Sequence, residues 1–185
     1  MDGNLLESSS SSLVRVDLAN LSQLVLKLLQ RKGMFAAEAE IFLNRLVEAD
    51  QCGLHAEGVG ALPQFLDAMD LGDIDPRARI ITVKETPATA VLDGSTGIGH
   101  VSATRAMQLA IDKARAVGTG TVVIRNSRWC GDVGGIVRLA ATAGLVGFVT
   151  SSFTEQVHNP CGDHALAWGF PSSSGSAPRI VRPQP

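Results

Sequence analysis

The spacing of apolar residues changes near Arg77, and this change constrains the fold more than any other feature of the sequence. Before Arg77, apolar residues recur three and four positions apart, which is the helical period. After it, short β-branched runs alternate with helical patterns. The order predicts an α/β protein with an N-terminal helical region followed by a sheet-based body.

The predicted elements follow from these two periods. Helices are predicted over residues 17–33, 36–51, 58–71, 101–117 and 133–143. Strands are predicted over residues 78–84, 88–92, 121–125 and 145–150.

Both ends of the chain differ in composition from the middle. A serine run, Ser8 to Ser12, cannot bury apolar surface, so residues 1–15 are predicted to be a flexible leader. Residues 170–185 are rich in Ser, Pro and Gly and are predicted to be a disordered tail. Residues 16–169 then form one domain.

Charge and cysteine content exclude several classes of partner. The net charge of −2 provides no basic field for nucleic acid, and no apolar run reaches the length of a membrane span. The N-terminus lacks the pattern of a secretory signal. The three cysteines are odd in number and widely spaced, which favours a reducing, cytoplasmic setting over a disulfide framework.

Residues 125–135 form the most suggestive local motif, because they leave a predicted strand and open a predicted helix. Glycines allow close approach of a ligand, and helix N-terminal N–H groups bind anionic oxygens, so a phosphate or carboxylate could lie here. The alternative is an ordinary strand-to-helix turn. A partial glycine fingerprint at Gly97-x-Gly99 is weak evidence for dinucleotide binding, since its third small position holds Ser102.

Isolated reactive side chains are weaker evidence for a functional site. His158, Cys161 and His164 have metal-like spacing without a fourth ligand, so no metal site is predicted. Lone histidines such as His100 and His55 are more often packing or surface residues than catalytic ones. Cys130 lies near a predicted helix start, which can lower a thiol pKa, but the sequence supplies no base for it.

Several short motifs occur in a fixed order between about Val16 and Trp168. They are residues 49–63, 71–74, 91–107, 125–131, 143–147 and 160–162. Each is unspecific alone, but in this order they resemble the malate/L-lactate dehydrogenase family. This non-Rossmann family also holds ureidoglycolate, sulfolactate and diketogulonate oxidoreductases. The resemblance implies that family's α/β fold, incomplete at the C-terminus.

The resemblance also implies a function, namely hydride transfer between NAD or NADP and a small 2-hydroxy or 2-oxo acid by a homodimer. The cofactor supplies the hydride chemistry in such enzymes. Carried over by position, the residues left to contact cofactor or substrate are Ser127, Gly131, Pro160 and Gly162.

Three polar motifs of the family pattern are changed here. Trp129 occupies the histidine position of the family's S-x-H-x-G motif, and an indole cannot take up a proton at useful pH. Ala56-Glu57 replaces Ser-His, and Ala61 replaces an arginine that would clamp a carboxylate. Glu57 is the remaining ionisable candidate, since a raised pKa would let it act as acid or base.

These departures leave three interpretations open. The first is an oxidoreductase with impaired or lost activity. The second is a non-catalytic remnant that binds a ligand or pairs with a subunit. The third is a fragment from a truncated or frameshifted gene, which would leave apolar residues such as Leu62, Phe65 and Leu66 without a partner.

Overall fold

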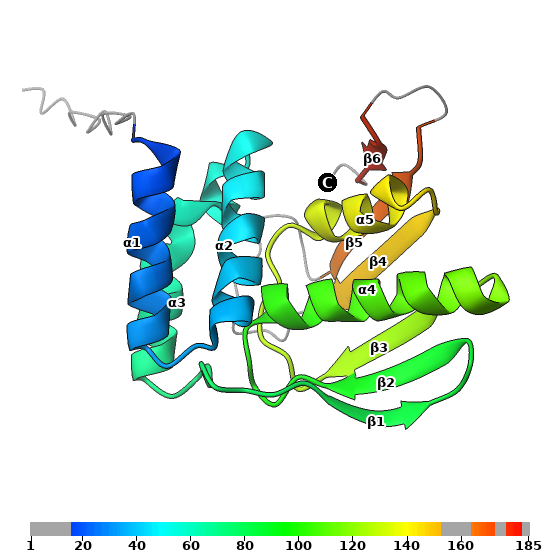
Figure 1. Ribbon diagram of the computed structural model, residues 1–185, viewed down its shortest axis with the longest axis horizontal. Helices are drawn as coiled ribbons and strands as arrows, with labels where there is room; N and C mark the ends of the chain where they lie inside the picture. The colour runs from blue at the N-terminus through cyan, green and yellow to red at the C-terminus, as the bar shows by residue number, and fades with distance from the viewer. Residues whose placement is uncertain (1–15, 153–163, 173–176, 183–185) are drawn as a thin grey trace, which may run out of the picture.

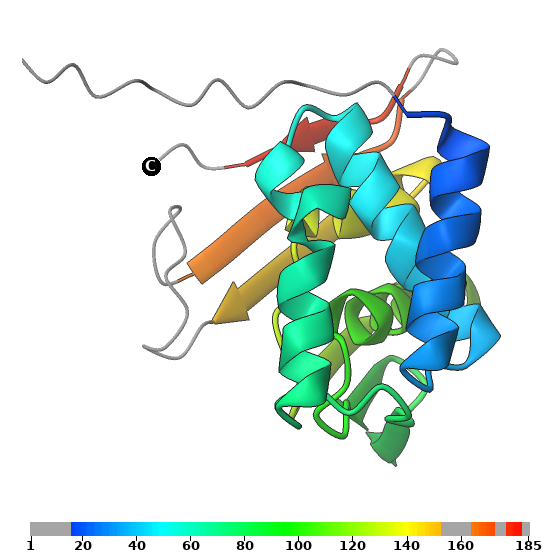
Figure 2. The same ribbon diagram turned by 90° about the vertical axis from the view of Figure 1, so that its left-hand side faces the viewer.

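The computed structural model describes residues 16–152, 164–172 and 177–182, so the predicted leader over residues 1–15 lies outside the described residues. Three helices form the N-terminal region: α1 (Leu18–Arg31), α2 (Ala36–Gln51) and α3 (Leu62–Asp70). The side chain of Asp17 accepts a hydrogen bond from the Asn20 N–H at the start of α1. Figure 2 shows the three helices together in front of the rest of the chain.

The approach to α3 differs from the predicted helix over 58–71. Two 3₁₀ turns, η1 (His55–Glu57) and η2 (Val59–Ala61), precede α3. The Asp50 carboxylate at the end of α2 accepts the N–H of Val59 and lies 3.0 Å from His55 Nδ1. These contacts hold the segment containing Glu57 as a tight turn, because a carboxylate offers the loop backbone a partner outside a helix.

The first sheet has the order β1 (Ile81–Glu85), β2 (Thr89–Asp93) and β3 (Thr121–Arg125). β1 and β2 are an antiparallel hairpin, whereas β2 and β3 are parallel and are joined by α4 (Gly99–Val117). Lys113 of α4 donates to Glu85 and to the Thr86 carbonyl, which ties the hairpin to the helix. Figure 1 shows α4 running between this sheet and α5.

The second sheet has the order β4 (Gly147–Ser152), β5 (His164–Phe170) and β6 (Arg179–Val181), all antiparallel. It packs on α5 (Val133–Thr142), as Figure 1 shows. Gly147 and Gly169 pair across β4 and β5, and a Cβ added there would lie 3.0 and 2.5 Å from the Val137 carbonyl oxygen. The helix backbone therefore lies directly against two glycines, whose missing side chains permit the approach.

Helix α4 joins two hydrophobic clusters. Its first turn reaches the cluster of the N-terminal helices, where Phe42, Leu29 and Leu46 are fully buried. Its later residues reach a second cluster under the second sheet, centred on Ile136 and Val137. Burying such a side chain contributes roughly 1.5–3 kcal/mol. No helix in the described ranges is long and apolar enough to cross a membrane.

The predicted α/β organisation, a helical region before a sheet-based body, is confirmed. Two strands were missed. β5 was not predicted, and residues 179–181, expected to be disordered, form β6 because they pair with Trp168–Phe170. The expectation that Leu62 and Phe65 lack a partner is also wrong, since both are buried among α1 and α2 side chains.

Candidate functional site

The turn between β3 and α5 carries the sequence-predicted residues Ser127, Trp129 and Gly131, and it lies against the loop that follows β2. The N–H of Thr96 donates to the Asn126 carbonyl, and the N–H of Arg128 donates to the Gly97 carbonyl. The two glycine-containing motifs that were read separately in the sequence therefore form one structure.

Asp93, at the end of β2, fixes this junction. Its carboxylate accepts hydrogen bonds from the Ser95 N–H, the Asn126 amide and the Arg125 guanidinium. The Ser95 N–H bond is the largest of the effects that hold the pKa of Asp93 below its usual range, and the Asn126 and Arg125 contacts act in the same direction.

Gly99 has a packing role. A Cβ at Gly99 would overlap the carbonyl oxygens of Arg128 and Trp129. The glycine therefore permits the first turn of α4 to approach the 126–132 turn, and this contact accounts for one glycine of the partial fingerprint.

Ser127 is committed to contacts within the protein. Its hydroxyl lies 2.5 Å from the hydroxyl of Ser102, a buried residue of α4, and also donates to the Arg128 carbonyl. The side chain thus ties the turn to α4.

Trp129 belongs to an aromatic cluster, which comprises Phe42, Phe65, His100 and Trp129. Its ring is stacked on Phe65 with a centroid distance of 5.4 Å, and it meets His100 edge-on at 6.0 Å. His100 is also 5.0 Å from Phe42 and 5.2 Å from Phe65. Trp129, which the resemblance places at the family's histidine position, is therefore built into the packing between α3 and α4.

His100 is buried and neutral. Burial, and secondarily the charge of Arg45, lower the pKa of His100 to about 3. A Cβ at Gly131 would overlap its Nε2 atom, so the ring fills the space beside that glycine. The interpretation of His100 as a packing residue is confirmed, and His55 lies exposed on the surface.

Glu57 has the chemistry of a proton carrier. Burial, with a second contribution from the charge of Asp132, raises the pKa of Glu57 to about 7. Its Oε2 atom is buried and has no hydrogen-bond partner among the described residues. A carboxyl with this pKa is half protonated at neutral pH, which suits a general acid or base.

Cys130, next to Trp129, is less reactive than an ordinary thiol. It is buried, and burial is the main reason that its pKa is raised. The charges of Glu57 and Asp132 act in the same direction, which places all three groups in one electrostatic environment. The nearby helix start does not offset these effects, so a nucleophilic role is not supported.

The start of α5 is already occupied by an anion of the protein. The Asp132 carboxylate accepts the N–H groups of Gly134 and Gly135 at 2.8 and 2.9 Å. Arg182, just after β6, holds the same carboxylate through contacts of 2.8 to 3.1 Å, and its guanidinium fills the space where a Gly134 side chain would lie. A dinucleotide phosphate therefore does not fit at this helix start.

The structure thus places Glu57, Ser127, Trp129 and Gly131 around one turn, while Pro160 and Gly162 lie outside the described residues. Ala61 is buried in the core. Sequence reasoning missed Asp132, although an aspartate before a helical run is an N-cap signal. It also missed Arg182, for which the tail offered no signal.

No cluster of three or more potential metal-binding side chains occurs within the described ranges. His158 and Cys161 of the proposed metal-like spacing lie outside those ranges.

Comparison with known proteins identifies relatives of one kind. A family model described as malate/L-lactate dehydrogenase matches residues 16–180. L-Sulfolactate dehydrogenase of Methanocaldococcus jannaschii is 39% identical over 143 residues, which cover 77% of this chain and 41% of that protein. Malate dehydrogenase of Pyrococcus abyssi is 37% identical over 134 residues, covering 72% and 37%. This chain therefore spans about two fifths of the length of these relatives.

Comparison with solved structures identifies the same kind of relative. The malate dehydrogenase of Pyrococcus horikoshii superposes with a TM-score of 0.82 at 28% identity, covering 91% of this chain and 50% of that one. The sulfolactate dehydrogenase of Methanocaldococcus jannaschii superposes with a TM-score of 0.80 at 34% identity, covering 90% and 49%. The described elements thus correspond to about half of each solved chain.

Proposed function

This chain belongs to the malate/L-lactate dehydrogenase family, and on that premise we propose that it is a weak oxidoreductase of small 2-hydroxy and 2-oxo acids. We propose NAD or NADP as its hydride partner and Glu57 as its proton carrier. The observation that carries the proposal is the buried Glu57 carboxyl, with its pKa of about 7, beside the turn that contains Trp129.

Proton transfer is the part of this reaction that the described residues can supply. Reduction of a 2-oxo acid places a proton on the carbonyl oxygen as C2 is reduced. The Trp129 indole cannot exchange that proton. His100, with a pKa of about 3, carries no proton to give at neutral pH, and the Cys130 thiol is buried with a raised pKa. These properties favour Glu57.

Weak turnover follows from the same residues. Ala61 is small and buried, so it provides no guanidinium to hold a substrate carboxylate. By its place in the motif, Trp129 replaces the family's histidine, and its ring is stacked on Phe65. Loss of a general acid alone costs roughly 10²–10⁴-fold in rate, and an imperfectly placed substitute recovers part of that factor.

The test is a steady-state assay of the 185-residue chain with pyruvate, oxaloacetate or sulfopyruvate and either NADH or NADPH. We expect turnover far below the typical value of about 10 s⁻¹. Above pH 7 the rate should fall about tenfold per pH unit, because the protonated fraction of Glu57 falls. Glu57→Gln should abolish the rate, while Glu40→Gln, on the exposed side of α2, should preserve it.

A rate that survives Glu57→Gln with an unchanged pH profile would refute the assignment of Glu57, and turnover of ordinary size would refute the weak activity. A complete lack of turnover with every pair would refute the oxidoreductase itself.

One observation favours the second candidate function, pairing with another subunit. The face of the second sheet that points away from α5 exposes Phe148, Trp168, Phe170 and Val181, and the first two rings lie 4.5 Å apart. Exposed apolar clusters of this kind usually contact another protein surface. Light scattering should then give twice the 19.4 kDa mass of the chain, reverting to one mass in Trp168→Ser.

A further inference from the structure

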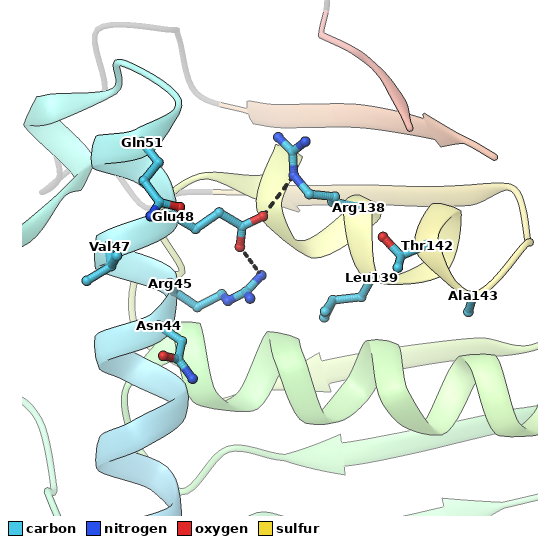
Figure 3. A pocket seen from close by; sticks show the side chains of 9 residues that line it. All are labelled: Asn44, Arg45, Val47, Glu48, Gln51, Arg138, Leu139, Thr142 and Ala143. Carbon is cyan, nitrogen blue, oxygen red and sulfur yellow. Dashed lines mark ion pairs between the residues drawn. The ribbon is translucent and has the colours of Figure 1, made fainter. Parts of the chain in front are cut away.

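A cleft of about 660 Å³ lies between α2 and α5. Figure 3 shows the side chains that line it, and the polar ones are Asn44, Arg45, Glu48, Gln51, Arg138 and Thr142. The size is within the range of small-molecule sites, roughly 300–1,000 Å³.

The cleft carries an excess of positive charge. Glu48 lies between two arginines, with its Oε2 2.6 Å from Arg45 Nη1 and its Oε1 2.8 Å from Arg138 Nε, as Figure 3 shows. One carboxylate thus faces two guanidinium groups. The three side chains are only 16–29% exposed, so solvent screens this excess incompletely.

Within the described ranges, no second carboxylate pairs with these two arginines. Arg45 also donates to the Gly135 carbonyl, and Arg138 donates to the Cys52 sulfur, and neither acceptor carries a carboxylate charge. The carboxylate of Asp132, near Gly135, is already held by Arg182 and by the first N–H groups of α5.

Several buried polar atoms in this region have no hydrogen-bond partner within the described part of the chain. They include Arg45 Nε, an atom of a residue that lines the cleft. Buried polar atoms are nearly always hydrogen-bonded to protein, water or ligand, so Arg45 keeps hydrogen-bonding capacity that its contacts with Glu48 and Gly135 leave unused.

We propose that this cleft binds a small anion through carboxylate or phosphate oxygens. The planar guanidinium groups of Arg138 and Arg45 match such oxygens in geometry and charge. The amides of Asn44 and Gln51 and the Thr142 hydroxyl can complete the contacts, while Leu139 offers an apolar surface to a carbon chain. The proposal does not depend on oxidoreductase activity.

The test is titration calorimetry on the 185-residue chain with inorganic phosphate and, separately, with malate, against sodium chloride at equal ionic strength. Arg138→Gln should weaken binding about tenfold or more, since a hydrogen bond to a charged group contributes about 1.5–3 kcal/mol. Glu48→Gln should tighten it, because the competing carboxylate is removed. Arg115→Gln, at the exposed end of α4, is the matched control and should change nothing.

The two ligands distinguish the sources of the anion. Tighter binding of phosphate assigns the cleft to phosphorylated ligands, and tighter binding of malate assigns it to carboxylic acids. Glu57→Gln should leave either affinity unchanged, which separates the cleft from the proton-transfer site. Binding no stronger than the chloride control, or equal affinity in Arg138→Gln and Arg115→Gln, overturns the proposal. That comparison still decides if Glu48→Gln fails to fold.

Discussion

The ring of Trp129 lies parallel to the ring of Phe65, with an interplanar angle of 4° and centroids 5.4 Å apart. Phe65 belongs to α3 and Trp129 to the turn before α5, so this stack joins the N-terminal helices to the candidate site. A side chain that the sequence presents as a lost catalytic group is, in the structure, a packing group.

The first prediction concerns the energy of this stack. A double-mutant cycle with Phe65→Ala and Trp129→Ala should give a coupling of about 0.5–1.5 kcal/mol, the value typical of aromatic pairs. Trp168→Ala, at an exposed ring on β5, should show no coupling to Phe65→Ala. Urea denaturation of the four chains measures the cycle, and additive losses would mean that the two rings do not interact.

The second prediction concerns Gly131, whose φ is +66°. Gly131→Ala should destabilise the chain by more than about 2 kcal/mol, because it combines a strained backbone with overlap on His100 Nε2. Gly144→Ala is the control, since its φ is +80° and no atom lies within 4 Å of the added Cβ. It should cost about 1–2 kcal/mol. Equal losses in the two variants, measured by thermal unfolding, would contradict the close packing of His100.

The third prediction compares two helix caps. Asp17→Ala removes the cap of α1 and should cost about 0.5–2 kcal/mol. Asp132→Ala removes the cap of α5 and also the partner of Arg182, so it should cost more. Arg182→Gln should account for the difference between the two losses. If Asp132→Ala costs no more than Asp17→Ala, the contact between Arg182 and the start of α5 contributes nothing to stability.

The fourth prediction is the pH dependence of stability that arises from Glu57. The pKa of Glu57 is about 7 in the folded chain and 4.5, the ordinary value of a glutamate, in the unfolded chain, so the unfolded chain loses this proton first as pH rises. The free energy of unfolding should therefore fall between about pH 4.5 and pH 7, and remain lower above that window.

Glu57→Gln removes this effect. The difference in the free energy of unfolding between the variant and the wild type should increase from about pH 4.5 to about pH 7 in favour of the variant. Above pH 7 this difference should stay constant. Denaturant titrations of both chains at several pH values measure the difference. A difference that does not change with pH would show that Glu57 has an ordinary pKa in the folded chain.

The elements in which apolar residues recur with a clear period could be predicted from the sequence. The bounds of α2 and of β3 agree with the predictions, because long apolar patterns and β-branched runs determine structure locally. β6 could not be found this way, since its three residues lie in a polar segment and become ordered through pairing with β5.

The location of the candidate site could be predicted from the sequence, but the contacts between its residues could not. The motif at residues 125–131 lies in the turn around which the candidate site is built, and Glu57 was recognised as a candidate whose pKa could be raised. That Asp132 and Arg182 close the start of α5 depends on residues 50 positions apart, and no local pattern records such a contact.

The paired glycines of the second sheet determine how the candidate site can adapt to a bound ligand. Gly147 and Gly169 bring the strand backbones against Val137, so at these two positions no strand side chain separates the helix from the sheet. Closely packed backbones resist sliding past one another, so α5 and the second sheet should move together as one rigid unit. A rearrangement of α5 that admits a substrate would then carry β4 and β5 with it.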